Sequence, residues 1–187
     1  MKRLDLSEKK IFLTFSILMG IVIISSNYLV QYPINHFNLN EILTYGAFTY
    51  PVTFLITDLA NRRFGKNIAR TIVYFGFMLG ILLTTFVSTN FENVISIRIA
   101  IGSGTAFIIA QLIDIEIFQF FRFRRWFVAP ITSSIFGSII DTFLFFSIAF
   151  LGTEISWVSL AFGDLSVKLL IALLLLIPFR LLIIKLK

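Results

Sequence analysis

The sequence contains no cysteine and only one histidine among its 187 residues. The lack of cysteine excludes a disulfide framework, a thiolate metal site and a cysteine nucleophile. Neither an HExxH nor a GxSxG motif is present, and His36 falls in a connection where a solvated side chain is the simpler interpretation. We therefore expect a protein that is not an enzyme and that has no catalytic residues, no metal ligands and no cofactor.

Charged residues are also scarce, at 14% of the chain, whereas hydrophobic residues make up 58%. A mean hydropathy of +0.94 is too high for a domain that must present a polar surface to water. The apolar runs are continuous and about 20 residues long, which fits membrane-spanning helices, whereas barrel strands are about 10 residues long and alternate in polarity. The composition predicts an all-α integral membrane protein.

Six spans are expected, and their short connections leave no room for a linker or a soluble domain. Residues 1–187 should therefore form a single compact bundle. The basic start of the chain resembles the flank of a signal peptide, but the apolar run behind it lacks a small-residue cleavage site, so we expect a retained first span. The spans are placed at 11–34, 42–60, 68–89, 96–121, 126–150 and 158–184.

Basic residues sort to one side of these spans. The N-terminus, the second and fourth connections and the C-terminus hold 14 of the 16 lysines and arginines, and the other three connections hold none. The positive-inside rule then places both termini in the cytosol. Because topology accounts for this basic charge, the pI of about 9.8 does not indicate binding to nucleic acid.

The most unusual residue is Asp141, which interrupts the apolar stretch from Trp126 to Phe150. An aspartate near the centre of a spanning helix costs about 2.5–3.5 kcal/mol, so it should face a cavity, a partner or a substrate path. Ser134 and Gly137 precede it by seven and four residues and open the same helix face. Asp141 is the first candidate for a functional residue.

The other intramembrane charges have simpler explanations that compete with a functional one. Asp58 can pair with Arg62 four residues later, and Asp164 can pair with Lys168 in the same way. Arg98 begins its span and can anchor it at the outer interface.

Asp114 shares a helix face with Gln111, whereas Glu116 points to roughly the opposite face. Asp114 is thus the better inward-facing acid, and Glu116 should pair near the loop Arg122–Arg125. Gly76 and Gly80, at four-residue spacing, and the small-residue stretch Ala100–Ala106 favour close helix packing.

A shared pocket would combine amide and carboxylate acceptors, cationic donors and phenyl walls from a chain with 23 Phe. Such a pocket fits a flat, polar-edged heterocycle, of which guanine-like bases are one class. The amides of the first span can equally serve helix packing. The candidate substrate-binding residues are Asn27, Gln31, Arg98, Gln111, Asp114, Asp141, Asp164 and Lys168.

Several blocks of sequence occur in an order that is far more specific than any one motif. They are SSNYLVQ (25–31), GAFTYPVTFLITDL (46–59), RRFG with the following AR (62–70), RIA (98–100), QLIDIEIF (111–118) and RRWFVAPITSSIFGSIIDTFLFFSIAF (124–150), followed by Asp164 and Lys168. Across nearly all six spans the chain resembles the vitamin uptake transporter family, whose members are known as queuosine precursor transporters.

The resemblance implies a bacterial inner-membrane importer of 7-cyano-7-deazaguanine or 7-aminomethyl-7-deazaguanine, salvaged for queuosine in tRNA. It supplies no assigned site, so the candidate residues rest on the physical argument alone. Three mechanisms stay open: alternating access, with or without a proton carried by a buried carboxylate; a substrate-binding subunit of an ATP-driven system; and, least favoured, an intramembrane enzyme. A homo-oligomer or a separate coupling module is also open.

Overall fold

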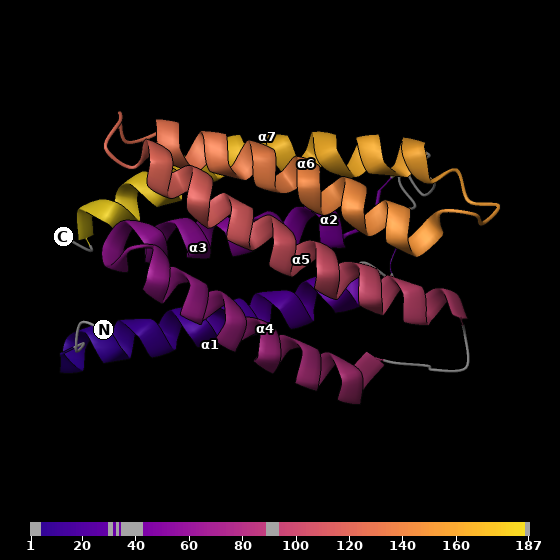
Figure 1. Cartoon of the computed structure of the whole chain (residues 1–187), viewed down its shortest axis with the longest axis horizontal. Coiled ribbons are helices and arrows are strands. Elements are labelled where there is room, and N and C mark those ends of the chain that lie inside the picture. Colours follow the sequence, from indigo (N-terminus) through magenta and orange to yellow (C-terminus); the bar gives the residue numbers. More distant parts are fainter. Residues whose placement is uncertain (1–4, 30–31, 33, 35–42, 89–93, 186–187) are drawn as a thin grey trace.

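The computed structural model describes residues 5–29, 32, 34, 43–88 and 94–185, and in this part of the chain every regular element is a helix. Five of the six expected apolar segments each form one of these helices, and the remaining segment is divided into two, so the described residues form seven helices. All of them lie roughly along one axis (Figure 1). They are α1 (Leu6–Leu29), α2 (Gly46–Thr49), α3 (Pro51–Phe64), α4 (Lys66–Ser88), α5 (Val94–Phe121), α6 (Val128–Phe150) and α7 (Trp157–Lys185).

Helix α1 begins earlier than the hydropathy of the sequence indicates, because a polar cap precedes the apolar run. The Asp5 carboxylate accepts a hydrogen bond from the Glu8 backbone N–H at 2.7 Å, and Glu8 Oε2 accepts one from the Asp5 N–H at 3.2 Å. This reciprocal pair satisfies two of the donors that a helix N-terminus leaves without partners. The helix therefore starts at Leu6 and not at residue 11.

The second expected span is interrupted in the structure, as α2 and α3 meet at Tyr50. Pro51 occupies the first position of α3, where its fixed φ suits a helix start and its missing N–H cannot donate to the Ala47 carbonyl one turn back. Helix α3 then runs to Gly65, whose φ of 85° ends it. The segment covers 46–64 and not the predicted 42–60.

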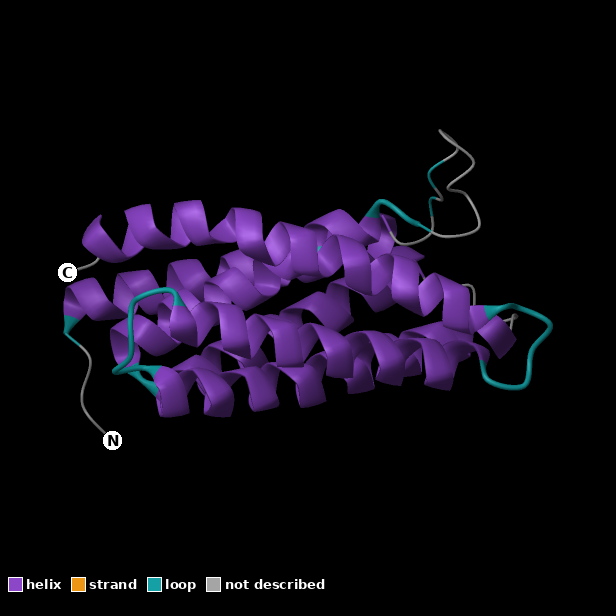
Figure 2. Ribbon diagram, turned by 90° about the horizontal axis from the view of Figure 1, so that it is seen from above, coloured by secondary structure: helices purple, strands orange, loops and turns teal. Residues whose placement is uncertain are grey.

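The two ends of the bundle differ in composition. The described ends of the chain, the turn at Gly65 and the loop 122–127 lie at one end, whereas the loop 151–156 lies at the other (Figures 1 and 2). Arg62 and Arg63, in the last turn of α3, lie at the first end. The loop that contains Arg122 and Arg124 lies at the same end. The basic residues gather there as the charge pattern predicts.

Within the described part of the chain, four helices are long and apolar enough to cross a membrane by length and composition: α1, α5, α6 and α7. Helix α7 is the most apolar of them, and large side chains such as Leu170, Leu174 and Ile177 are more than half exposed along it. Exposed apolar surface of this kind is expected where lipid replaces water.

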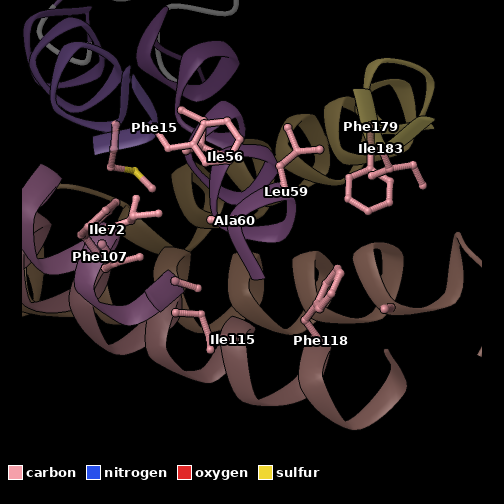
Figure 3. Packing of buried hydrophobic residues seen from close by; sticks show 14 of the residues in the cluster. Phe15, Ile56, Leu59, Ala60, Ile72, Phe107, Ile115, Phe118, Phe179 and Ile183 are labelled. Carbon is pink, nitrogen blue, oxygen red and sulfur yellow. The ribbon is translucent and has the colours of Figure 1, made fainter. Parts of the chain in front are cut away.

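Helix α3 lies at the centre, where it contacts α1, α4, α5, α6 and α7. Its Ile56, Leu59 and Ala60 meet residues from the surrounding helices in one apolar cluster, in which Phe118 packs edge-on to Phe179 with ring centroids 6.3 Å apart (Figure 3). The central position of α3 places its polar side chains inside the protein.

Gly76 and Gly80 of α4 let α1 approach closely, which confirms the packing interpretation of this pair. A Cβ on Gly76 would lie within about 2.4 Å of Met19 Cγ, and one on Gly80 within about 2.6 Å of Ile23 Cγ2. In the same way, a Cβ on Gly102 would lie 3.3 Å from the Phe145 carbonyl oxygen of α6. Small residues thus set the spacing of two helix pairs.

Candidate functional site

A cavity of about 170 Å³ lies between α1, α2, α5, α6 and α7. Its size is similar to the engineered cavity of about 150 Å³ that holds one aromatic ring. Most of its surface is apolar or aromatic, and polar atoms are concentrated at a few points. Its lining includes Ser26, Asn27, Thr44, Gly46, Ala47, Tyr50, Ile99, Ser103, Asp141, Phe145, Phe146, Phe150, Leu160, Asp164 and Lys168.

A buried ion network forms the charged part of this lining. Lys168 Nζ lies 2.8 Å from Asp141 Oδ2 and 2.5 Å from Asp164 Oδ2, and it also donates to Thr142 Oγ1 at 3.1 Å. The Thr142 hydroxyl in turn donates to Asp164 at 2.8 Å. The Asp164–Lys168 pair predicted from the four-residue spacing is therefore present, and it extends to Asp141 on the neighbouring helix.

The charged side chains of this ion network are shielded from solvent. Lys168 is 4% exposed and Asp141 is 2% exposed, whereas the Asp164 side chain retains 13%. Isolated charges are costly at such depth, and the network reduces that cost by pairing them and by adding hydrogen bonds. In the ionised form, two carboxylates and one ammonium leave a net negative charge beside the cavity.

One oxygen of Asp141 is not used by this network. Asp141 Oδ1 is buried and has no hydrogen-bond partner among the described residues, whereas Oδ2 is held by Lys168. A buried acceptor without a donor costs about 1–3 kcal/mol, a cost that a bound molecule with N–H groups would remove. Asp141 can thus be fixed by Lys168 and still accept a hydrogen bond from a ligand.

Tyr50 places an aromatic surface next to the charges. The Lys168 ammonium lies 5.1 Å from the centroid of the Tyr50 ring, within the range of a cation–π interaction. Tyr50 stands at the junction of α2 and α3, and Gly46 and Ala47 of the same interruption also line the cavity. An interrupted helix beside a binding site is a recurring feature of membrane carriers, because it exposes backbone groups to the substrate.

Asn27 of α1 is also part of the cavity lining. Its Oδ1 accepts a hydrogen bond from Ser103 Oγ of α5 at 3.2 Å, and both residues line the cavity. The neighbouring Ser26 hydroxyl lies 2.9 Å from Thr49 Oγ1 of α2. These hydrogen bonds join α1 to α5 and α1 to α2 at the cavity. Asn27 and Ser26 can therefore both hold helices together and contact a ligand.

The structure brings together half of the candidate residues and leaves the others elsewhere. Asn27, Asp141, Asp164 and Lys168 line the cavity. Arg98 instead donates to the backbone carbonyls of Ile148 at 3.0 Å and Leu151 at 2.7 Å, as an anchor of the α6 end would. Gln31 lies outside the described residues.

Gln111 and Asp114 form part of a separate polar group against α3. Gln111 Nε2 donates to Thr53 Oγ1 at 2.9 Å, and its Oε1 accepts from Thr57 Oγ1 at 2.5 Å. Neither Gln111 nor Asp114 lines the large cavity, although both are completely buried. They share a helix face as the spacing predicts, and that face is turned toward α3.

Two predicted ion pairs are wrong. Asp58 forms no described ion pair with Arg62, because the carboxyl points into the protein and accepts from Ser133 Oγ at 3.1 Å. Glu116 pairs with Arg70 at 2.5 Å and Lys66 at 3.4 Å of α4, and not near the loop 122–125. In both cases a neighbouring helix offers a partner that spacing along the chain does not reveal.

Arg62 and Arg122 form an arginine clasp at the basic end of the bundle. Arg62 Nη1 donates to the Arg122 carbonyl at 2.5 Å, and Arg122 Nη2 donates to the Arg62 carbonyl at 2.9 Å. Partial burial, with a smaller contribution from the charge of Arg62, lowers the pKa of Arg122 from its ordinary value. This clasp joins the end of α3 to the loop that precedes α6.

Tyr50, Ser103 and Thr142 belong to the site but are not among the residues predicted from the sequence. Tyr50 precedes Pro51, a pair that marks a helix boundary, and Ser103 stands within the small-residue stretch assigned to packing. Thr142 follows Asp141 directly, so a search for charges alone passes over it. Among the described residues, no group of acids, histidines and cysteines could hold a metal ion.

Comparisons with known proteins identify the family of this chain. The family described as "Putative vitamin uptake transporter" matches residues 44–183. The chain is 34% identical to the "Queuosine precursor transporter" of Escherichia coli (strain K12), with 84% of this chain and 79% of that protein aligned. It is 32% identical to the "Probable queuosine precursor transporter" of Haemophilus influenzae, with 93% and 86% aligned.

A third relative, the "Probable queuosine precursor transporter" of Bacillus subtilis (strain 168), is 30% identical over 58% of this chain. No solved structure matches the chain. The apolar helices and these relatives identify a multi-pass membrane protein. With three-quarters of its length matched by the family and two relatives aligned over most of their chains, the protein belongs to the vitamin uptake transporter family.

Proposed function

We propose that this protein imports queuosine precursors, 7-cyano-7-deazaguanine or 7-aminomethyl-7-deazaguanine, across the bacterial inner membrane for salvage into tRNA. The names of the relatives support the substrate class. The observation that carries the proposal is Asp141, which Lys168 holds through Oδ2 while Oδ1 remains a buried acceptor beside an aromatic cavity.

The chemistry of the cavity suits a guanine-like base. A ring N–H or exocyclic amino group can donate to Asp141 Oδ1, and Tyr50, Phe145 and Phe146 offer surfaces for the ring faces. The net negative charge of the ion network would also favour the cationic aminomethyl form. Asn27, which also lines the cavity, can contact the other polar groups of the base. We retain Arg98, Gln111 and Asp114 as residues that support transport from outside the cavity.

We also propose that the chain crosses the membrane six times with both termini in the cytosol, and that import proceeds by alternating access. Together α2 and α3 cover 46–64, which at 1.5 Å per residue is close to the thickness of about 30 Å of a bilayer core. Helix α4, with 23 residues, is long enough to cross as well. The basic end of the bundle would then face the cytosol.

The test uses cells that cannot make the precursor and that lack any other importer. These cells receive the native chain, Asp141→Asn or Glu154→Gln, and either deazaguanine at limiting concentration, and the queuosine content of their tRNA is measured. Loss of a charge-assisted hydrogen bond costs about 1.5–3 kcal/mol, so Asp141→Asn should require about 10- to 100-fold more precursor. Glu154 is exposed in the loop 151–156, so its variant controls for loss of a carboxylate.

Restoration by the native chain and by Glu154→Gln but not by a well-inserted Asp141→Asn is the expected result. Equal restoration by both variants would remove Asp141 from the substrate path. No restoration by the native chain would overturn the queuosine assignment. Uptake by the purified chain alone in liposomes would separate a carrier from a substrate-binding subunit, because the latter requires its ATP-driven module.

A further inference from the structure

A second group of buried acids lies outside the substrate cavity. Asp58 of α3 is 1% exposed and Asp114 of α5 is 0% exposed, and the two carboxyls lie close enough for their charges to interact. Neither forms an ion pair with a described lysine or arginine. This arrangement contrasts with the cavity, where Lys168 forms an ion pair with each of the two acids.

The hydrogen bonds of this acid pair are incomplete. Ser133 Oγ donates to Asp58 Oδ1 at 3.1 Å, but both oxygens of Asp114 are buried without a partner among the described residues. Two ionised carboxylates can only accept, so they cannot satisfy each other. One proton on the pair converts an acceptor into a donor, removes the repulsion and lets one carboxyl hydrogen-bond to the other.

A cavity of about 10 Å³ lies beside Asp58, between α3, α6 and α7. This volume corresponds to about one water molecule. The hydroxyl of Ser138 lines it, is completely buried and has no described hydrogen-bond partner, and Ser134 lines it from the same helix. A water there would have Asp58 and two hydroxyls as partners and could carry a proton to or from the carboxyl.

The surroundings of the pair contain no competing described base. Helix α6 presents the hydroxyls of Ser133, Ser134 and Ser138 here, and its one acid, Asp141, lies at the substrate cavity. Helix α7 lines the small cavity with Ala172, Leu175, Leu176 and Phe179, and α2 has no ionisable residue. The described acids and bases of α1 lie in its first turns, and Lys66 and Arg70 of α4 bind Glu116. Because no described cation forms an ion pair with either acid, a bound proton is the means by which the charge of the pair can be reduced.

The same helices carry residues of both sites. Tyr50, which caps the start of α3 at the substrate cavity, precedes Asp58 by eight residues, about 12 Å along a helix axis. On α6, Asp141 follows Ser134 by seven residues, about 10 Å. A shift of either rigid helix on substrate binding would therefore change the surroundings of the acid pair.

We propose that Asp58 and Asp114 together bind one exchangeable proton and form the coupling site of the carrier, separate from the substrate cavity. The proposal rests on the transport function inferred above. One proton enters with each substrate molecule, and release on the cytosolic side deprotonates the pair through the water-sized cavity. The substrate is not changed chemically.

The experiment uses the full chain in liposomes with radiolabelled 7-cyano-7-deazaguanine, which carries no charge of its own at neutral pH. The membrane potential is clamped at zero, and the outside is one pH unit more acidic. With one proton per substrate, this gradient supports about 10-fold accumulation. Accumulation is measured for the native chain, Asp58→Asn, Asp114→Asn and the control Glu116→Gln. Glu116 is an exposed acid two residues beyond Asp114.

Exchange of labelled for unlabelled substrate without a gradient is measured in the same preparations. The native chain and Glu116→Gln should accumulate substrate about 10-fold. The two aspartate variants should exchange substrate but should not accumulate it. Addition of substrate should also alkalinise the external medium for the native chain, a measurement that does not depend on the folding of any variant.

Four outcomes would overturn the proposal while the transport function stands. These are native exchange without accumulation, accumulation driven by a sodium gradient in place of the pH gradient, accumulation that both aspartate variants retain, and loss of exchange together with accumulation in monodisperse variants. Absence of both exchange and uptake in the native chain would instead overturn the transport function itself.

Discussion

Replacement of Lys168 by methionine tests whether one ammonium holds the substrate cavity together. The side chain is 4% exposed and its Nζ contacts Asp141, Asp164 and Thr142 within 3.1 Å. Methionine fills a similar volume but leaves two carboxylates without a cation. Loss of one partner of a buried ion pair costs about 3–5 kcal/mol, so we expect Lys168→Met to lower the free energy of unfolding by that amount.

The measurement is reversible unfolding in mixed detergent micelles, followed by helical circular dichroism. Lys185→Met is the matched control, because Lys185 is exposed near the end of the same helix, and its effect should stay within about 0.5 kcal/mol. The double variant Asp141→Asn, Lys168→Met removes one uncompensated carboxylate. It should be more stable than Lys168→Met by about 0.5–3 kcal/mol.

A loss below about 1 kcal/mol for Lys168→Met would contradict the compensation argument, since surface ion pairs already reach that value. A double variant that is less stable than Lys168→Met would also contradict the compensation argument. In that case the Asp141 carboxylate would stabilise the protein even without the lysine.

Three further changes test the packing and the helix interruption. Gly76→Ala should cost about 1–3 kcal/mol, because its Cβ would overlap Met19 at 2.4 Å, whereas Gly104→Ala, with nothing nearer than 3.5 Å, should be neutral or slightly stabilising in the same unfolding assay. Pro51→Ala supplies the missing backbone N–H and should join α2 to α3, so uptake in liposomes should fall while stability is kept or raised; unchanged uptake would show that the interruption is not needed. Arg122→Ala removes one of the two hydrogen bonds of the arginine clasp, the one from Arg122 Nη2 to the Arg62 carbonyl, and should cost about 1.5–3 kcal/mol. An effect under about 0.5 kcal/mol would show that this bond is worth no more than an ordinary surface contact.

The sequence alone determines the class of the protein and the location of most helices. Apolar runs of spanning length require helices, because every backbone group in a bilayer needs an internal partner. It also determines that Asp164 and Lys168 pair, since four-residue spacing brings them together on any helix. Even the spacing of α1 and α4 follows from Gly76 and Gly80.

Only the tertiary structure decides which helix faces which. Spanning helices are apolar on all sides, so periodicity does not reveal the face that turns inward. For this reason the sequence assigns Asp58 to Arg62 on its own helix, whereas the fold turns Asp58 toward Ser133 and Asp114. The ion pair between Asp141 and Lys168 likewise depends on which faces of α6 and α7 are turned toward each other.

The separation of the acids into two groups follows from the same cause. Asp141 and Asp114 are both carboxylates in apolar runs, and the local sequence does not show which partner each will meet. Helix α7 brings a lysine to the first, whereas α3 brings a second acid to the second. Local sequence determines where charges occur along each helix, and packing between helices determines whether each charge meets a cation, a hydroxyl or another acid, because those partners lie tens of residues away in the chain.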